Sequence, residues 1–376
     1  MVEIEKDQAV LIDAGVLFTP KRHRRDPFAL KVLGAAAVFS AAIFSSDFKK
    51  EAVVVPSSTL HSQLPSNLEF GFNTHLTSKE GSWNLEIDAF RGNVDELANH
   101  GQTWIRFNIL RWEAAALSTD GLRIIWNQEE LKVYDEAIFY ANEKGLKIFL
   151  VSTPPAVGQN YSQSDYLSLT KQYYEGLVSR YGSLVDVWQL NNEADIHHWA
   201  DYGLLNSLSD EYLGQFAAQV GVAREVIKRA DDNAIFTVNV SGWPLDERTE
   251  NRWYKFLDSL RPYLDAVTLD IYVINDLTEI KRLNQMIDRL AQRYGLGVII
   301  GELGVCTAGN YTQEDQASII PSAIDRLKKA PLKSIIVYEI QDEGSDRDRD
   351  CESNFGIKNA DGSKKSSFEK VMNSMR

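Results

Sequence analysis

Residues 128–152 read QEELKVYDEAIFYANEKGLKIFLVS, and this stretch contains the unit from which the fold is built. Residues 128–144 carry apolar side chains at helical spacing and predict an amphipathic helix. Gly145 follows, and glycine readily adopts the left-handed conformation in which many helices end. Residues 146–152 are then almost continuously apolar, which is typical of a parallel strand that is buried on both faces. We therefore expect a helix, a glycine stop and a parallel strand here.

The same unit recurs along the chain from residue 67 onward. Gly101, Gly182 and Gly295 also stand between an amphipathic stretch and an apolar run. We expect each of them to end a helix in the left-handed conformation. The expected strands are 69–74, 103–109, 146–152, 185–190, 235–240, 266–273, 298–301 and 334–340. The expected helices are about 86–100, 128–144, 163–181, 209–230, 249–260, 276–295, 313–329 and 365–375.

Eight strand–helix units predict an α/β fold, the (β/α)8 TIM barrel, as one domain over residues 67–376. The alternative is a doubly wound sheet, which binds nucleotide phosphates at a glycine-rich turn after its first strand. The stretch FGFNTHL at 70–76 contains no such turn, and the chain has no GxGxxG or GxxxxGK[ST] motif. The barrel is therefore the preferred interpretation.

The composition limits the classes of partner and cofactor. The 376 residues include 40 Lys and Arg against 53 Asp and Glu, a formal net charge of −13. A nucleic-acid partner is not expected, because such binding draws its affinity from clustered basic side chains. Two cysteines are too few for a thiolate-rich metal site, and the six histidines include no HExxH. We expect no metal and no cofactor, and we interpret the acidic stretch 342–354 as a solvated loop.

The first 66 residues differ from the barrel sequence. Residues 1–27 form a basic tail that ends near KRHRR, residues 28–46 are apolar, and residues 47–66 resemble a linker with Pro and Ser. A basic cluster before an apolar run is typical of a signal-anchor or signal segment. The uninterrupted apolar part is as short as a signal-peptide core, but no clean Ala-x-Ala cleavage site follows. We expect a membrane-anchored or exported protein whose barrel is extracytoplasmic, periplasmic or extracellular; a buried helix at 28–46 is the alternative.

Four residues mark the expected functional end of the barrel, since barrel active sites lie at the C-terminal ends of the strands. Glu193 follows the fourth strand in WQLNNEAD, and Glu302 follows the seventh in IIGELG. The second strand contains Arg106, in TWIRFNI, and the sixth ends at Tyr272, in TLDIYV. A buried Arg is costly unless a carboxylate pairs with it. We therefore expect Arg106 to pair with a carboxylate; a purely structural pairing with an Asp of the core is the alternative to a role in the site.

These motifs resemble those of the clan A glycoside hydrolases, the barrel superfamily of retaining glycosidases with carboxylates at the ends of strands four and seven. WQLNNEAD is similar to the Trp-x-x-x-Asn-Glu-Pro-Asp pattern of that clan, and family 39 is the most similar family, followed by family 5. Three further stretches are similar to the same group: FRGNVDELANHGQTWIRFNI, KQYYEGLVSRYGSLVDVWQL and NFGIKNADGSKKSSFEKV. The resemblance extends from about residue 67 to the end of the chain.

The resemblance implies a role for each matching residue. Glu193 matches the general acid/base, and Glu302 matches the nucleophile of a double displacement. Asn192 matches the residue that binds the sugar 2-hydroxyl, and Arg106 matches the cation beside the nucleophile. An Arg and the Tyr272 hydroxyl would favour an ionised nucleophile, whereas apolar and amide neighbours would keep the acid protonated. In a retaining enzyme the two carboxyl groups lie about 5–5.5 Å apart.

The chain departs from the clan pattern at three places. Ala194 replaces the Pro of the motif, outside the chemistry. Asp270 stands where many relatives have a His, which adds a carboxylate near the site. Relatives usually end strand eight with a Trp under the −1 subsite, and here residues 338–343 read YEIQDE. We expect Glu339 or Gln341 to bind sugar hydroxyls instead, and a substrate other than plain cellulose or xylan.

Other residues near the expected strand ends are candidates for sugar contacts. Trp112, Trp199 and Trp243 fall just past strands two, four and five, where an indole can stack under a pyranose ring; core packing is the alternative. His75, just past strand one, is a candidate subsite residue.

Cys306 and Cys351 fall in the expected loops after strands seven and eight. Neighbouring loops can bring two cysteines within bridging distance, and a disulfide is expected if the domain lies outside the cytoplasm. Two separate free thiols are the alternative.

The sequence thus predicts a retaining glycoside hydrolase that cleaves O-glycosidic bonds in a polysaccharide or oligosaccharide without a cofactor. A barrel that binds carbohydrate without cleaving it is the alternative from another class, for example in the assembly of a surface polysaccharide. The pair of Glu193 and Glu302 disfavours it, since binding requires no acid and nucleophile. A transglycosylase would use the same residues and differ only in its acceptor.

Overall fold

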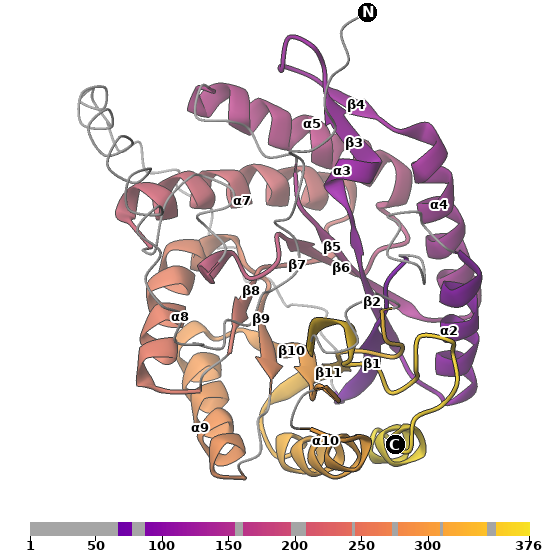
Figure 1. The fold of residues 1–376 in the computed structure, drawn as a ribbon. Helices are drawn as coiled ribbons and strands as arrows, with labels where there is room; N and C mark the ends of the chain where they lie inside the picture. The colour runs from indigo at the N-terminus through magenta and orange to yellow at the C-terminus, as the bar shows by residue number, and fades with distance from the viewer. Residues whose placement is uncertain are drawn as a thin grey trace, which may run out of the picture. The chain divides into compact units, whose positions relative to one another are not determined.

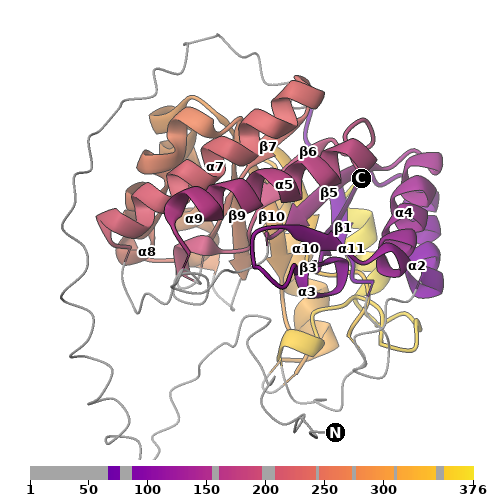
Figure 2. The same cartoon turned by 90° about the horizontal axis from the view of Figure 1, so that it is seen from above.

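The computed structural model describes residues 67–76, 87–154, 161–196, 208–242, 245–272, 277–308, 311–343 and 351–376. These residues form a barrel of parallel strands surrounded by helices (Figures 1 and 2). The expected tail, signal-anchor and linker over residues 1–66 lie outside the described residues. The barrel strands are β1 (Glu69–Asn73), β2 (Trp104–Ile109), β5 (Lys147–Ser152), β6 (Val187–Leu190), β7 (Ile235–Thr237), β8 (Asn239–Ser241), β9 (Ala266–Tyr272), β10 (Gly297–Gly304) and β11 (Leu332–Val337).

The barrel closes at its fifth strand position. The sheet order is β7-β6-β5-β2-β1-β11-β10-β9-β8, so β7 and β8 stand at the two ends of the sheet. These two strands are consecutive in the chain and are separated only by Val238. Across the junction, the Asp265 N–H donates to the Phe236 carbonyl at 2.9 Å. Together β7 and β8 therefore occupy one position, and the predicted eight-unit barrel is confirmed.

Eight helices cover the strands at the positions that the sequence predicts. A short helix and a two-stranded hairpin also follow β2, which the sequence interpretation did not include. The covering helices are α2 (Ile87–Asn99), α4 (Gln128–Glu143), α5 (Gln163–Tyr181), α7 (Asp210–Ala230), α8 (Glu247–Leu260), α9 (Leu277–Tyr294), α10 (Gln313–Leu327) and α11 (Phe368–Ser374). The additional elements are α3 (Arg111–Ala114), β3 (Ala115–Leu117) and β4 (Ile124–Trp126).

Three of the four glycines expected to end helices are left-handed. Gly101, Gly145 and Gly295 have φ angles of 69°, 78° and 61°. At Gly182 the helix ends as predicted, but the expected left-handed conformation is wrong, because this residue is right-handed with φ −51°. Packing favours glycine at this position instead, because a Cβ atom there would lie 2.7 Å from the Val178 carbonyl oxygen.

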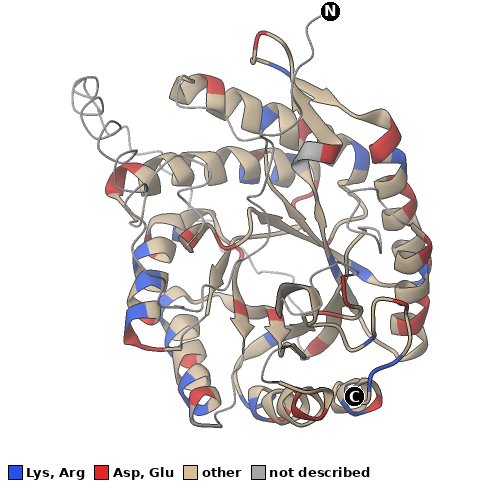
Figure 3. Ribbon diagram, viewed as in Figure 1, with Lys and Arg blue, Asp and Glu red and all other residues tan. Residues whose placement is uncertain are grey.

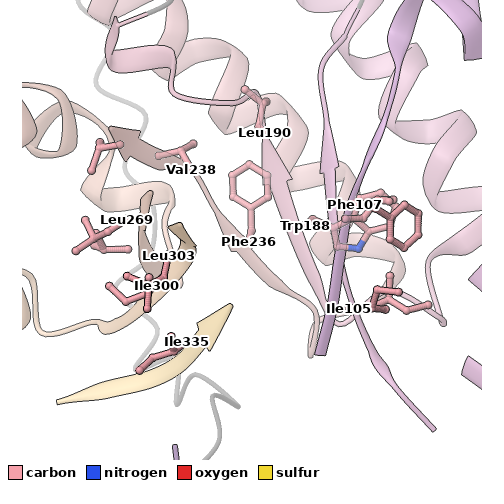
Figure 4. Close-up of a cluster of buried hydrophobic side chains, with 14 of the residues drawn as sticks. Ile105, Phe107, Trp188, Leu190, Phe236, Val238, Leu269, Ile300, Leu303 and Ile335 are labelled. Atoms are coloured by element: carbon pink, nitrogen blue, oxygen red, sulfur yellow. The ribbon is translucent and has the colours of Figure 1, made fainter. Parts of the chain in front are cut away.

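The strands bury apolar side chains on both faces. The outward face packs against the helices in one large cluster, of which Figure 4 shows Ile105, Trp188 and Leu269 among others. The inward face begins with a layer that takes one residue from each of seven strands, because side chains alternate along a strand. This layer consists of Trp104, Phe149, Val187, Ile235, Ala266, Ile299 and Ile336.

Acidic and basic residues are interspersed along the outer helices (Figure 3), and several of them form ion pairs. Between α8 and α9, Arg289 lies 2.6 Å from Glu250 and Arg293 lies 2.5 Å from Asp258. Ion pairs on the outside of a protein contribute little stability, because water and salt screen them. Most of the stability of the barrel therefore comes from its apolar layers.

Candidate active site

The inward face of the barrel changes from apolar to polar toward the C-terminal ends of the strands. Two residues beyond the apolar layer in β2, β6, β7 and β9, the same face carries polar side chains instead. Because the strands are parallel, these side chains all lie at one end of the barrel. They are Arg106, Gln189, Thr237 and Thr268, followed further along the same face by Asn239 and Asp270.

Arg106 is the centre of this polar layer and is only 1% exposed. Its Nη1 atom donates to Glu302 Oε1 and to Asn73 Oδ1, each at 2.6 Å. Its Nη2 atom donates to Gln189 Oε1 at 3.1 Å and to Asn192 Oδ1 at 3.2 Å. The expected pairing of this buried Arg with a carboxylate is therefore present in the structure. Charge-assisted bonds of this kind fix both partners in one geometry.

A β-bulge in β10 directs Glu302 into the barrel. In the pairing with β9, Ile300 lies opposite Leu269 and Glu302 lies opposite Asp270, so Gly301 is an extra residue. A Cβ atom at Gly301 would lie 2.5 Å from the Thr268 methyl group, and therefore only glycine fits there. A bulge of this kind reorients the following side chain, and bulges are common beside active sites.

Tyr272, at the end of β9, completes the contacts of Glu302. Its hydroxyl donates to Glu302 Oε2, while Oε1 accepts from Arg106. Both carboxylate oxygens thus accept a hydrogen bond, one from the neighbouring strand β9 and one from β2, which is not adjacent to β10. The side chain of Glu302 is held in one orientation before any substrate binds.

Asp270 is fully buried beside this ion pair. Its Oδ2 atom accepts a hydrogen bond from Asn239 Nδ2 and lies 3.6 Å from Arg106 Nη2. Burial raises the pKa of Asp270 well above its usual value, and the neighbouring Glu302 charge adds to the increase, while Arg106 opposes it. Asp270 therefore holds its proton over a wider pH range than an exposed aspartate does.

The chain that carries Glu193 has an unusual backbone. Asn191 and Glu193 have φ angles of 59° and 46°, which are uncommon for residues other than glycine. Two side-chain amides hold this shape: Asn239 Oδ1 accepts the Glu193 N–H at 2.8 Å, and Gln189 Nε2 donates to the Asn191 carbonyl at 2.8 Å. The same Asn239 donates to Asn192 Oδ1 at 2.9 Å. Strained backbone of this kind persists where the surroundings enforce it and often marks a functional site.

The last residue of the motif, Asp195, attaches this loop to the neighbouring strand. It is buried, and its Oδ1 accepts the Ser241 N–H at 3.0 Å while Arg252 Nε lies 2.7 Å from its Oδ2. The Tyr212 hydroxyl also donates to the Ala194 carbonyl at 2.8 Å. The position of Glu193 is thus fixed from β8 and from two helices.

Two predicted residues from opposite ends of the barrel sequence meet at the junction of β1 and β11. His75 Nε2 lies 3.0 Å from Glu339 Oε2, and His75 Nδ1 lies 3.3 Å from Glu343 Oε1. Burial raises the pKa of Glu339 to about 7, against the lowering effect of His75. The Tyr338 ring stands edge-on to His75 at 5.8 Å and to Tyr272 at 6.0 Å, so this junction adjoins the Glu302 site.

The remaining predicted residues have varied positions. The side-chain amide of Gln341 donates to the Ala360 carbonyl at 2.8 Å, and so it braces the chain after β11. Trp112 belongs to α3 at the end of β2. Trp199 and Trp243 lie outside the described residues.

The expected disulfide is present between Cys306 and Cys351, with the Cα atoms 5.3 Å apart. It packs in a small cluster with Tyr338 and Phe355, beside the end of β11. The bridge therefore links the chain after β10 to the chain after β11 at the mouth of the barrel.

The sequence interpretation missed three amides that organise the site: Asn73, Gln189 and Asn239. All three are buried: Asn73 and Gln189 lie near the C-terminal ends of β1 and β6, and Asn239 begins β8. Buried amides require hydrogen-bond partners, so their position in such strands was an available signal.

A family model agrees with this geometry. The model described as glycosyl hydrolase family 10 matches residues 149–374, from β5 to α11. The chain belongs to glycosyl hydrolase family 10. It is therefore a glycosidase of clan A that hydrolyses O-glycosyl bonds in a carbohydrate substrate. The resemblance to the clan is confirmed. The prediction of family 39 or family 5 is not confirmed, since the matching model is that of family 10. The motifs behind that prediction are shared across the clan, and so they did not separate its families.

Solved structures share the barrel of this family 10 chain at low sequence identity. The β-glycosidase from the hyperthermophile Thermosphaera aggregans is 12% identical with a TM-score of 0.61, over 82% of this chain and 95% of that one. The exo-β-1,4-mannosidase Op5Man5 from Opitutaceae bacterium strain TAV5 is 14% identical with a TM-score of 0.63, over 82% and 59%. A family 39 glycoside hydrolase from Bacteroides cellulosilyticus WH2 is 13% identical with a TM-score of 0.60, over 82% and 63%. At these identities the likeness establishes the fold.

Two further findings concern the sequence relatives and the helices of the family 10 chain. No curated protein sequence matches it significantly. Among the helices of the described residues, none is both long enough and apolar enough to span a membrane.

Proposed function

We propose that the chain is a retaining glycoside hydrolase, with Glu302 as the nucleophile and Glu193 as the general acid/base. The observation that carries this proposal is the fixation of Glu302. Arg106 and Tyr272 occupy one oxygen each, and the Gly301 bulge turns the carboxylate into the mouth of the barrel. A nucleophile that must approach an anomeric carbon along one line gains most of its advantage from such positioning.

In the first step, Glu193 protonates the glycosidic oxygen while a Glu302 oxygen attacks the anomeric carbon. The bond to the leaving sugar breaks, and a glycosyl ester forms on Glu302. In the second step, Glu193 accepts a proton from water, which attacks the same carbon and releases Glu302 as a carboxylate. Asn192 lies next to the acid and within the Arg106 network, as a contact to the sugar 2-hydroxyl requires.

The charge balance supports this division of roles. When Glu302 becomes an ester, its negative charge disappears and Arg106 loses its nearest counter-ion. Asp270, 3.6 Å from Arg106, is the carboxyl group that can replace it. The buried guanidinium thus keeps a partner in both halves of the reaction, which a buried charge requires.

For the substrate we propose a β-linked oligosaccharide or polysaccharide. The names of two solved structures with the same fold, a β-glycosidase and an exo-β-1,4-mannosidase, support β-glycosides as the first class to test. Tyr338 and Glu339 stand where relatives usually have the tryptophan of the −1 subsite. We therefore still predict a sugar other than those of plain cellulose or xylan.

We also propose that the barrel works outside the cytoplasm, anchored or exported through residues 28–46. The Cys306–Cys351 disulfide supports this location, because disulfides are rare in the reducing cytoplasm.

Mechanism-based labelling tests the proposed roles. The full chain is treated with a panel of activated 2-deoxy-2-fluoro β-glycosides, and its peptides are analysed by mass spectrometry. The fluorine slows hydrolysis of the glycosyl ester more than its formation, so the label accumulates on the nucleophile. We expect a label on Glu302 that is absent from Glu302→Gln, whose kcat/KM falls on the order of 10⁴-fold or more.

Glu193→Gln is the matched control, because it removes the acid and leaves the nucleophile. With an activated leaving group that needs no protonation, we expect this variant to accept the label and to release it more slowly than the wild type. A label on another residue would contradict the assignment. Saturable binding of the sugars without any label would favour a non-catalytic barrel, and transfer of the sugar to a second sugar rather than to water would indicate a transglycosylase.

A further inference from the structure

The first and last strands of the barrel bring three ligand-type side chains together outside the proposed catalytic residues. β1 and β11 are parallel neighbours, with Phe72 opposite Val337, and the Ile340 N–H donates to the Asn73 carbonyl at 3.1 Å. Residues shortly after each strand therefore lie side by side. We name His75, Glu339 and Glu343 the seam cluster.

The seam cluster combines an imidazole with two carboxylates. The imidazole lies between them, 3.0 Å from Glu339 through Nε2 and 3.3 Å from Glu343 through Nδ1. One ligand atom from each of the three side chains can be chosen so that all three lie within 4.8 Å of one another. The side chains of His75 and Glu343 are 21% and 31% exposed, so an ion can reach the cluster from solvent.

Glu339 has an unsatisfied oxygen atom inside the cluster. Its side chain is completely buried, and its Oε1 atom accepts no hydrogen bond from any described residue. The Nζ atom of the nearby Lys365 has other direct partners, since it lies 2.7 Å from Asp342 and donates to Thr307 at 2.8 Å. An imidazolium at His75 would balance only one of the two carboxylates. A buried carboxylate oxygen without a hydrogen-bond donor is costly.

We propose that the seam cluster binds a divalent first-row metal ion, Zn²⁺ or Mn²⁺. A nitrogen and two carboxylate oxygens form a donor set that such ions accept, whereas Ca²⁺ and Mg²⁺ prefer oxygen donors alone. A charge of +2 neutralises both glutamates and provides the partner that the Glu339 Oε1 atom lacks.

The spacing of the side chains is close to that of a metal site. Bonds of about 2.0–2.2 Å place neighbouring ligand atoms about 3–3.5 Å apart. His75 and Glu339 already have this spacing, at 3.0 Å. Glu343 is the most exposed of the three and needs the smallest rearrangement of its neighbours to approach. The remaining coordination positions of the ion would face solvent and take water.

A metal here would fasten the two strands that begin and end the barrel. It would also restrain Tyr338, whose ring contacts His75 on one side and Tyr272 on the other. Tyr272 in turn donates to Glu302. The site is separate from the proposed acid and nucleophile, and its existence does not depend on which reaction the enzyme catalyses.

Calorimetry on the chelator-treated full chain without a histidine tag tests the proposal directly. We expect Zn²⁺ and Mn²⁺ to bind at one ion per chain and to raise the melting temperature, and Ca²⁺ to bind at least about tenfold more weakly. Glu339→Gln and His75→Asn should each weaken Zn²⁺ binding by about tenfold or more, because losing a ligand commonly costs at least that factor. Electron paramagnetic resonance of bound Mn²⁺ gives a second readout that requires no enzyme activity.

His100→Asn is the matched control, because His100 Nδ1 also lies near a carboxylate, 3.4 Å from Glu96, at the end of α2. This variant should bind Zn²⁺ like the wild type. If Glu339→Gln does not fold, the more exposed Glu343→Gln replaces it with the same expected loss. Absence of Zn²⁺ and Mn²⁺ binding to the wild type at millimolar ion, or undiminished binding in the His75 and Glu339 variants, would overturn the proposal.

Discussion

Two buried charged groups at the same end of the barrel differ in how their charge is balanced. Around Arg106, four side chains accept hydrogen bonds from one guanidinium, and Glu302 uses both of its oxygens. In the seam cluster, Glu339 is equally buried but leaves its Oε1 atom without a donor among the described residues. The first group is organised by a charge that belongs to the chain. The second places two carboxylates around one imidazole, and this difference is the basis for the two proposals, a metal ion at the seam cluster and catalysis around Arg106.

The largest expected effect comes from removing the internal cation. Arg106→Met leaves Glu302 and Asp270 as buried carboxyl groups without a counter-ion, and breaking a buried pair from one side costs about 3–5 kcal/mol of unfolding free energy. The loss of a donor to the nucleophile should also lower kcat/KM by about 10²–10³-fold. Urea unfolding and steady-state kinetics measure the two effects.

Arg180→Met is the control for that experiment. Arg180 forms a comparable two-bond pair with Asp135, but their side chains are 32% and 24% exposed. Water and salt screen such a pair, so its removal should cost only about 1 kcal/mol or less. Equal destabilisation by the two variants would show that burial does not make the Arg106 ion pair more important for stability than the more exposed Arg180 pair.

The sequence predicts the proposed catalytic residues much better than the seam cluster. Glu193, Glu302, Arg106 and Tyr272 each stand at the end of an apolar run or within one, where a polar residue is conspicuous. Parallel strands place such residues at one end of a barrel, so their proximity follows from the fold class. The strand and helix ranges were predictable for the same reason, since hydrophobic periodicity depends on which faces are buried.

Other features depend on three-dimensional contacts that no local pattern encodes. The Gly301 bulge depends on the Thr268 methyl group of the neighbouring strand, and the left-handed Glu193 depends on an amide from β8. His75 and Glu339 are far apart in the chain and meet only because the last strand pairs with the first. Gly182 shows the opposite error, because the glycine is present at the end of the helix and yet has a right-handed conformation.

An intermediate effect is expected from the disulfide beside the seam. Cys306 and Cys351 are 45 residues apart, and closing a loop of that length stabilises a fold by about 4 kcal/mol in the chain-entropy model, with measured values of about 2–4 kcal/mol. The double variant Cys306→Ser/Cys351→Ser should lose that amount of unfolding free energy. A reductant should lower the stability of the wild type and leave the variant unchanged; equal responses of both proteins would contradict a stabilising bridge.

The smallest expected effect comes from Asp270, which is buried beside Arg106. It is a change in how the free energy of unfolding depends on pH. Its folded pKa is raised above the value of 3.8, mainly by burial and then by the charge of Glu302. The folded state therefore holds a proton that the unfolded state releases as the pH rises above about 4. The contribution of Asp270 to stability is present below that pH and is lost as the pH rises toward its folded pKa.

Asp270→Asn removes this proton and keeps an oxygen that can accept the hydrogen bond from Asn239. The free energy of unfolding of the variant should thus fall less than that of the wild type as the pH rises above about 4, with each unit of pKa difference worth about 1.4 kcal/mol. Urea unfolding across this range measures the two slopes, and Asp88→Asn, at a side chain that is 96% exposed, should follow the wild type. Parallel curves for Asp270→Asn and the wild type would mean that folding does not raise the pKa of Asp270. The network around Arg106 would then stabilise two ionised carboxylates with one guanidinium and the surrounding amides, and the contrast with the seam cluster would be sharper still.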